Sequence, residues 1–309
     1  MNPYLSLLLG VVCAGLRGEF FVRGSVGLAR QLGVSAGIIG ATLAAFATSA
    51  PELSVGVQSA LAGEPQISLG NAVGANVLNI ALILGVAALI APIRAPREGI
   101  KRDFPVALVV PVVTGALCLD GVISRVDGAL LIGVFLVWFV FTVREANGQR
   151  SATGAVLGAR GLAREIVQGL AGLGLLALAG NRIVAGASTL ATAWGLDEFI
   201  VGATVVAAGT TVPEMATVLI AKYRGHDEVG LGTVLGSNIF NGLFIVGTVA
   251  CLHPILINWK EIDAALLFGV LSVVCVWPSA AGVLDRRRGL VLLVIYAVYL
   301  GVVLQRPPA

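Results

Sequence analysis

The sequence predicts an all-α membrane protein with ten transmembrane helices, arranged as two inverted five-helix repeats. Three observations predict this fold. Of the 309 residues, 57% are hydrophobic and only 12% are charged, whereas soluble domains carry about a quarter charged residues. Apolar runs recur along the chain at the length of about 20 residues that spans a bilayer. Two long motifs also occur once in each half, at one constant spacing.

The apolar runs leave no room for a soluble domain between them. The first run lacks the basic start of a signal peptide, because Arg17 is the first basic residue, and we expect it to be retained as a helix. The ten predicted spans cover 3–31, 36–62, 67–91, 104–120, 127–145, 165–192, 197–221, 229–253, 263–279 and 289–305.

Basic residues alternate between the two sides of the predicted bundle. Fourteen of the twenty Lys and Arg residues lie in the connections after spans 1, 3, 5, 7 and 9. Cytoplasmic loops of membrane proteins are enriched in Lys and Arg. These connections should therefore face the cytoplasm, and both termini should lie outside.

An internal repeat relates the two halves of the chain. Residues 39–53 match 201–215, and residues 70–85 match 232–247, both at an offset of 162 residues without a gap. Five predicted spans separate equivalent elements, and because five is odd the halves must insert with opposite orientation. This plan is typical of secondary transporters with a site at the midplane. The predicted organisation is a first repeat (1–145, motif 39–85), a short cytoplasmic linker (146–163) and a second repeat (164–309, motif 201–247).

Acidic residues within the spans mark the candidate site. Only Glu19, Glu52 and Glu214 of the seventeen acidic residues fall there, and an ionisable group in the bilayer is costly unless it lines a cavity or is paired. Glu52 and Glu214 are equivalent in the repeat, and each directly follows a proline, Pro51 or Pro213. Proline removes a backbone donor and disfavours helical geometry before it. Spans 2 and 7 should therefore be broken at the midplane.

The broken spans and their neighbours offer only oxygen ligands. The set comprises the two carboxylates, the carbonyls around Ala45 to Thr48 and Ala207 to Thr210, the hydroxyls of Thr48, Ser49, Thr210, Thr211 and Ser237, and the amides of Asn79 and Asn241. Hard cations such as Ca²⁺ prefer such ligands. Two glutamates give a charge of minus two, which one Ca²⁺ or about two Na⁺ would neutralise. Mutually exclusive occupancy would give antiport, and protons are the rival exchange ion, since they can also discharge the pair.

At these residues the chain resembles the cation/calcium exchangers, and within them the sodium/calcium exchanger branch. That family's repeats typically read G-T-S-x-P-E and G-S-N-x-x-[ND]. Here the corresponding segments are 47–52 (ATSAPE), 74–79 (GANVLN), 209–214 (GTTVPE) and 236–241 (GSNIFN). The similarity extends over essentially the whole chain.

The resemblance implies an antiporter of the prokaryotic cell membrane in which spans 1 and 6 slide across the other eight. It implies that Glu52 and Glu214 bind Ca²⁺ with the carbonyls of Thr48 and Thr210. Flanking sodium positions would use Ser49, Thr211, Ser237 and the carbonyls of Ala45 and Ala207. The implied partners are inorganic cations and the lipid bilayer, with no nucleic acid, no obligate protein partner and no cofactor beyond the transported Ca²⁺ and Na⁺.

Three positions depart from the family pattern. Ala47 replaces the first motif glycine, and Ala75 replaces a serine, which removes one hydroxyl. Asn241 is neutral where potassium-dependent members often carry aspartate, which argues against potassium co-transport. The proton-exchanging branch resembles G-N-x-x-E at the first motif, so the sequence favours sodium. The linker 146–163 is too short for a calcium-sensing domain.

Several alternatives stay open at this point. Sodium/calcium exchange is the leading prediction. The alternatives are proton/calcium exchange and, after it, exchange of another divalent cation such as Mn²⁺ or Mg²⁺. A channel is disfavoured because an inverted repeat with one central carboxylate pair suits alternating access. The protein is not expected to be an enzyme, because no span carries an Asp pair, a serine dyad or a histidine motif for proteolysis. Asn76 and Asn238 could equally well bind the ion or hold helices together.

Overall fold

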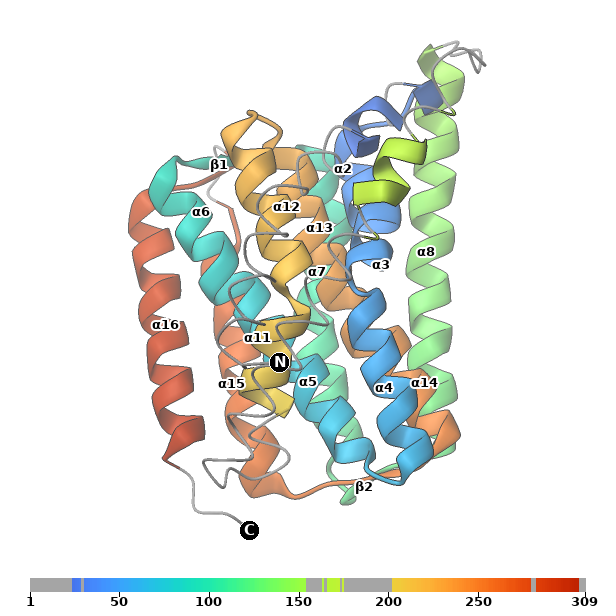
Figure 1. Ribbon diagram of the computed structural model, residues 1–309, viewed down its shortest axis with the longest axis vertical. Coiled ribbons are helices and arrows are strands. Elements are labelled where there is room, and N and C mark those ends of the chain that lie inside the picture. Colours follow the sequence, from blue (N-terminus) through green and yellow to red (C-terminus); the bar gives the residue numbers. More distant parts are fainter. Residues whose placement is uncertain are drawn as a thin grey trace.

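A computed structural model describes residues 24–28, 31–153, 163, 166–172, 174, 202–278 and 282–305 of the chain. The described part is a bundle of helices with two very short sheets (Figure 1). The first half contains α2 (Ala36–Ile39), η1 (Gly40–Ala44), α3 (Ala45–Thr48), α4 (Ala50–Ala62), α5 (Pro65–Val77), η2 (Leu78–Leu84), α6 (Gly85–Ile90), β1 (Ile93–Arg94), α7 (Arg97–Leu117), β2 (Val122–Ile123) and α8 (Arg125–Thr153). The second half contains η3 (Gly202–Val206), α11 (Ala207–Thr210), α12 (Val212–Tyr223), α13 (Asp227–Ile239), η4 (Phe240–Ile245), α14 (Val246–Leu252), β3 (Ile255–Leu256), α15 (Trp259–Val276), β4 (Val283–Leu284) and α16 (Arg286–Leu304).

Two helices bend where the sequence predicts breaks. The segment 36–48 meets α4 at 44°, and the segment 203–210 meets α12 at 50°. The bends lie at Ser49 and Thr211, and a proline follows in the first turn of α4 and of α12. Proline is favoured at the start of a helix, where its missing N–H costs nothing. Each proline therefore begins a new helix rather than kinking one continuous helix.

Six apolar spans can be recognised in the described part of the chain. Four are single helices, at Pro65–Ile90, Arg125–Gln149, Asp227–Leu252 and Arg286–Leu304, and two are the bent pairs. The fourth and ninth predicted spans correspond to α7 and α15, which are 21 and 18 residues long but carry five and three charged residues, respectively, in their first two turns. The first and sixth predicted spans, with Glu19, lie largely outside the described residues.

Glycines allow the helices around the bends to approach closely. A side chain at Gly74 of α5 would collide with the backbone of Ala203 in η3, and one at Gly236 of α13 would collide with the backbone of Ala41 in η1. Gly74 and Gly236 are equivalent in the sequence repeat, as are Ala41 and Ala203. Small residues at helix contacts are characteristic of packing within membranes. Each broken helix is therefore held tightly against a helix of the opposite half.

The two sheets also join opposite halves. β1 pairs antiparallel with β4, and β2 pairs antiparallel with β3. β1 and β3 are 162 residues apart, the offset of the sequence repeat. The two pairs lie at opposite ends of the bundle, as the positions of β1 and β2 show in Figure 1.

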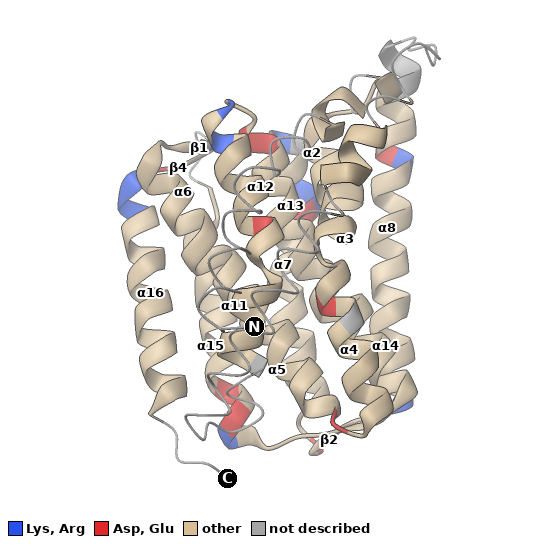
Figure 2. Cartoon of the chain, in the orientation of Figure 1, with Lys and Arg blue, Asp and Glu red and all other residues tan. Residues whose placement is uncertain are grey.

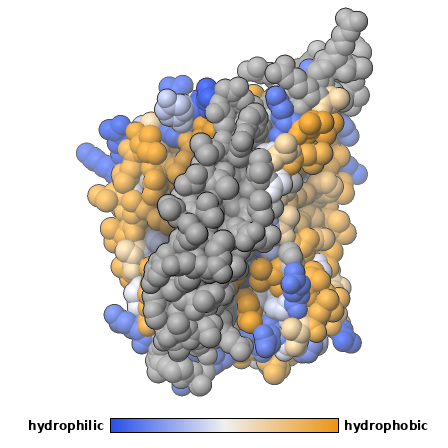
Figure 3. Space-filling view, viewed as in Figure 1, coloured by the Kyte–Doolittle hydropathy of each residue, from blue (hydrophilic) through white to orange (hydrophobic). Residues whose placement is uncertain are grey.

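The surface of the described part is that of a membrane protein. Figure 2 shows charged residues mainly at the two ends of the bundle, with Lys and Arg prevailing at the end where β1 lies. Figure 3 shows hydrophobic side chains on both flanks between these ends. Large apolar side chains such as Val137 and Val294 are more than half exposed on α8 and α16. This belt fits a bilayer, with the predicted cytoplasmic end at β1.

Candidate functional site

The two bends place a pair of glutamates inside the bundle. Glu52 lies in the first turn of α4 and Glu214 in the first turn of α12, and both are fully buried. The N-terminal ends of the two helices favour negative charge by their dipoles. Each break thus creates a helix N-terminus next to a glutamate inside the bundle. An unbroken helix would have no terminus at this depth.

Glu214 accepts hydrogen bonds from two hydroxyl groups. Ser49 donates to its Oε1 atom at 3.0 Å and Ser237 donates to the same atom at 3.2 Å. The Ser237 hydroxyl also lies 3.4 Å from the carbonyl oxygen of Ala45. The structure therefore brings together four residues that the sequence predicts as ligands: Ser49, Glu214, Ser237 and Ala45.

Glu52 has no such support. Within the described part of the chain, neither of its carboxylate oxygens has a hydrogen-bond partner. At the positions equivalent to Ser49 and Ser237, Thr211 donates instead to the carbonyl of Ala207 at 2.8 Å, and Ala75 has no hydroxyl. The two glutamates are equivalent in the sequence but have unequal surroundings. One cause is that Ala75 has no hydroxyl. The other is that the Thr211 hydroxyl bonds to the backbone of its own helix and not to Glu52.

The remaining predicted hydroxyls lie at the ends of the broken helices. Thr48 donates to the carbonyl of Ala45 at 3.2 Å, and Thr210 lies 3.3 Å from the carbonyl of Ala207. Thr210 also contacts the amide oxygen of Asn71, at 3.2 Å. Sequence reasoning missed Asn71, although it lies one helical turn before Ala75 and so shares its face. Asn71 is a further buried polar residue beside the site.

Four asparagines from α5, η2, α13 and η4 form a reciprocal network. Asn76 donates through Nδ2 to the Asn238 carbonyl at 3.1 Å, and Asn238 donates to the Asn76 carbonyl at 2.9 Å. Asn79 donates to Oδ1 of Asn238 at 3.0 Å, and Asn241 donates to Oδ1 of Asn76 at 3.3 Å. Asn76 and Asn238 thus hold helices of the two halves together.

This network fixes the orientation of all four amides. A backbone carbonyl only accepts, so the amide nitrogens of Asn76 and Asn238 must point at the carbonyls, and their Oδ1 atoms must accept. Asn79 and Asn241 then have to donate through nitrogen. Their own Oδ1 atoms remain buried with no hydrogen-bond partner in the described ranges. The network therefore leaves two amide oxygens available as ligands.

Five buried oxygens of the candidate site lack hydrogen-bond partners among the residues that the structure describes. They are both carboxylate oxygens of Glu52, Oε2 of Glu214, and the Oδ1 atoms of Asn79 and Asn241. Buried polar atoms are nearly always hydrogen-bonded, and an unsatisfied one is costly. All five atoms can accept but none can donate while the glutamates are ionised. A bare cation satisfies such a set, and oxygen ligands without nitrogen or sulfur suit a hard one.

Some features around the site were not evident from the sequence. Asn79 and Asn241 lie in the π-helical segments η2 and η4, a geometry that often occurs at functional sites and has no clear sequence signal. Asp103 is also buried, although the sequence places it just before a span; it pairs with Arg102 and accepts from Trp138. Within the described residues, no three His, Cys, Asp or Glu side chains cluster as a metal site.

The chain is similar to several known proteins in sequence and in structure. The family model of the sodium/calcium exchanger proteins matches residues 3–144 and 165–305. The putative antiporter CaxA of Alkalimonas amylolytica is 34% identical over 257 residues, 80% of each chain. The sodium/calcium exchanger MaX1 of Methanosarcina acetivorans is 26% identical and covers 96% of this chain and 97% of its own. A solved structure of the sodium-calcium exchanger NCX_Mj, soaked with Na⁺ and Sr²⁺, superposes with a TM-score of 0.83 at 27% identity, covering 97% of this chain and 98% of that one.

Proposed function

The chain belongs to the sodium/calcium exchanger protein family, and from this premise we propose that it exchanges Na⁺ for Ca²⁺ by alternating access. Its membership makes it a membrane cation exchanger rather than an enzyme. The observation that carries the finer proposal is the set of five unpartnered oxygens on Glu52, Glu214, Asn79 and Asn241. These atoms form the proposed Ca²⁺ site, with the carbonyls of Thr48 and Thr210 as further ligands.

The charge balance of the site supports coupled exchange over uncoupled transport of a single cation. Two ionised carboxylates in a buried site repel each other and are stable only with a compensating charge. One Ca²⁺ supplies that charge, and so do about two Na⁺. Because the same carboxylates serve both ions, binding of one kind excludes the other. If access to the site changes sides only when its charge is neutralised, the two fluxes are coupled.

The surroundings of Glu214 support one sodium position. The hydroxyls of Ser49 and Ser237 both contact Glu214, at 3.0 and 3.2 Å. The Ser237 hydroxyl also lies 3.4 Å from the carbonyl oxygen of Ala45. On the Glu52 side, Thr211 and the carbonyl of Ala207 would form the equivalent position, weakened by the absence of a hydroxyl at Ala75. We therefore propose sodium coupling with unequal positions. The neutral Asn241 fits exchange without potassium.

Reciprocal contacts support an inverted repeat with ten helices. The asparagine network, the glycine contacts and the two strand pairs all relate equivalent positions of the two halves. A two-fold axis in the plane of the membrane would produce such pairs. In this arrangement the repeats are 1–145 and 164–309, joined by the linker 146–163. Spans 1 and 6 would slide across the core to alternate access.

The charge distribution supports the orientation in the membrane. Lys and Arg prevail at the end where β1 lies (Figure 2), and the basic end of a membrane protein faces the cytoplasm. We propose a prokaryotic inner-membrane location with both termini outside. Several relatives are prokaryotic, including the inner membrane protein YrbG of Escherichia coli, which is 29% identical over 284 residues.

Proton/calcium exchange is the second candidate. The bare carboxylate of Glu52 favours it, because a group without donors must be neutralised by some cation when no metal is bound. The hydroxyls around Glu214 favour sodium, since a proton needs no additional ligands. Exchange of another divalent cation, such as Mn²⁺ or Mg²⁺, uses the same oxygens.

Tracer flux in proteoliposomes tests the proposal. Vesicles loaded with Na⁺ and diluted into sodium-free medium should take up ⁴⁵Ca²⁺, and vesicles in sodium on both sides should not. A matched series carries an imposed proton gradient in sodium-free medium. Uptake driven by the proton gradient, with no response to sodium, would assign the protein to proton exchange instead.

A further inference from the structure

A large groove runs between α7 and α8, away from the ion site. Its volume is about 910 Å³, within the size range of ligand sites. Its apolar wall contains Val106, Val109, Val134, Val137 and Phe141. Val137 and Phe141 are more than half exposed, on a helix that is itself a candidate membrane span. The groove therefore opens toward the lipid.

The end of the groove that lies near β1 is basic. Lys101, Arg102 and Arg144 line it together with Glu145. Arg102 is already neutralised, because it pairs with Asp103 at 2.7 Å and with Glu145 at 2.9 Å. Lys101 and Arg144 are exposed and make no hydrogen bond or ion pair with any residue that the structure describes. The polar end of the groove thus carries three cations against the two carboxylates of Asp103 and Glu145, a net charge of plus one, and Lys101 and Arg144 are the two cations that lie outside the ion pairs.

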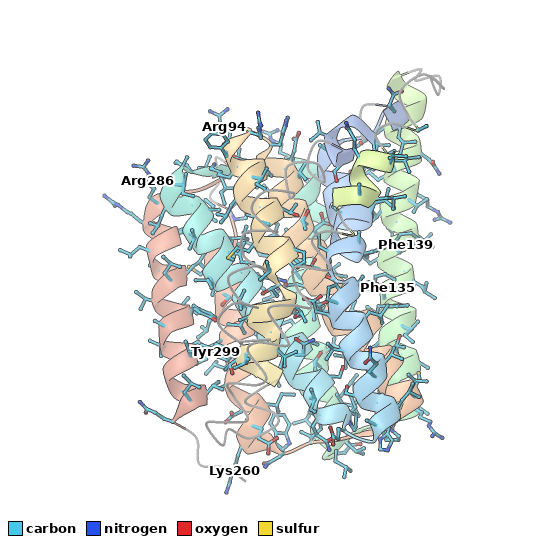
Figure 4. All side chains as sticks on the ribbon, viewed as in Figure 1. Arg94, Phe135, Phe139, Lys260, Arg286 and Tyr299 are labelled. Carbon is cyan, nitrogen blue, oxygen red and sulfur yellow. The ribbon has the colours of Figure 1, made fainter. Side chains whose placement is uncertain are left out.

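The inner wall of the groove is rigid. Trp138 is 4% exposed, and its Nε1 donates to Asp103 at 3.3 Å. Its ring packs edge-on against Phe46 of the broken helix at 6.4 Å, and against Phe135 at 5.7 Å. Figure 4 shows Phe135 and Phe139 on the side of α8 that faces α3 and α4. Because Trp138 is fixed from two sides, the groove is formed before any ligand arrives, which favours binding.

We propose that this groove binds one anionic phospholipid of the leaflet at the β1 end. Its phosphate group would interact with Lys101 and Arg144, and an acyl chain would lie along the valines and Phe141. Basic pockets between transmembrane helices suit anionic head groups in this way. A zwitterionic lipid fits the apolar wall equally well but brings a positive charge beside two others. The proposal does not depend on which ions the protein exchanges.

Lipid binding to the purified full-length protein tests the proposal. Native mass spectrometry would count bound phosphatidylglycerol and phosphatidylcholine with identical acyl chains, and thermal unfolding would be followed in parallel. We expect one phosphatidylglycerol to be retained in preference. At about ten times its Kd it should raise the Tm by about 2–4 °C.

Matched variants separate the groove from general surface charge. Lys101→Gln with Arg144→Gln should abolish the preference for phosphatidylglycerol and the shift in Tm. The control, Arg97→Gln with Arg287→Gln, removes two exposed basic residues that do not line the groove, and it should behave as the wild type. Val137→Trp keeps the charge but fills the groove, and it should also reduce retention. Equal retention of the two lipids by the wild type, or undiminished preference in the Lys101/Arg144 variant, would overturn the proposal.

Discussion

Substitution of Ala75 by serine tests the inequality of the two glutamates. Ala75 is fully buried at the position equivalent to Ser237, whose hydroxyl contacts Glu214 at 3.2 Å. A serine at position 75 should place the same hydroxyl beside Glu52, whose oxygens lack partners. It adds one oxygen ligand for sodium without adding charge.

The expected size of the effect follows from this contact. A hydrogen bond to a charged group contributes about 1.5–3 kcal/mol. Fitting one extra atom into a packed site is unfavourable and reduces this gain in free energy. A net gain of about 1.4 kcal/mol corresponds to a tenfold change in affinity. We expect the Na⁺ concentration for half-maximal activation to fall about tenfold in Ala75→Ser.

The assay is the sodium dependence of ⁴⁵Ca²⁺ efflux from proteoliposomes at fixed Ca²⁺. The mirror variant, Ser237→Ala, removes the hydroxyl from the other half and should weaken sodium activation by a similar factor. The double variant moves the hydroxyl from one half to the other and should return close to the wild type. Unchanged or weakened sodium activation in Ala75→Ser, with Ser237→Ala impaired, would refute the assignment of the two halves as equivalent.

Three further predictions concern the carboxylates, the network and the orientation. Glu52→Gln and Glu214→Gln each remove half of the site's charge and should lower calcium transport by about 100-fold or more while the protein remains folded; wild-type flux in either would exclude that glutamate as a ligand. Asn76→Ala removes the acceptor that orients a ligand amide, so the calcium concentration for half-maximal transport should rise about tenfold with little change in maximal rate; an equal fall in folded protein and rate would indicate a purely structural role. A cysteine at Gly99 should be shielded from an impermeant thiol reagent in intact cells and one at Gly121 labelled, and the reverse pattern would invert the orientation.

The sequence was most informative where proline and charge act locally. A proline removes a backbone donor and disfavours a continuous helix, so the bends before Pro51 and Pro213 could be predicted from the sequence. The same residue type does not always break a helix, because α7 continues through Pro105 and Pro111. Carboxylates in apolar segments must be compensated, so Glu52 and Glu214 could be predicted as the centre of the site. Both side chains are fully buried, and their place at the centre of the site and their role as ligands stay predictions.

The arrangement of side chains could not be predicted in the same way. Asn76 and Asn79 have the same side chain, and only their contacts with the other half distinguish them. The Asn76 amide is used in hydrogen bonds that hold the helices together. Asn79 donates through its nitrogen, and its Oδ1 has no partner among the described residues. Thr211 resembles Ser49 in sequence, yet its hydroxyl bonds to its own helix at Ala207 and not to a glutamate. A threonine hydroxyl can often satisfy itself on the preceding turn. The inequality of the two halves is therefore a tertiary property.

The position of a bound divalent cation tests the central claim most directly. Crystals of the full-length protein soaked with Sr²⁺ would reveal the ion by its anomalous scattering, since strontium replaces calcium among oxygen ligands. The proposal predicts one buried peak between Glu52 and Glu214, close to the amide oxygens of Asn79 and Asn241, which excess Na⁺ removes. A peak elsewhere in the bundle, with none between the two glutamates, would contradict it.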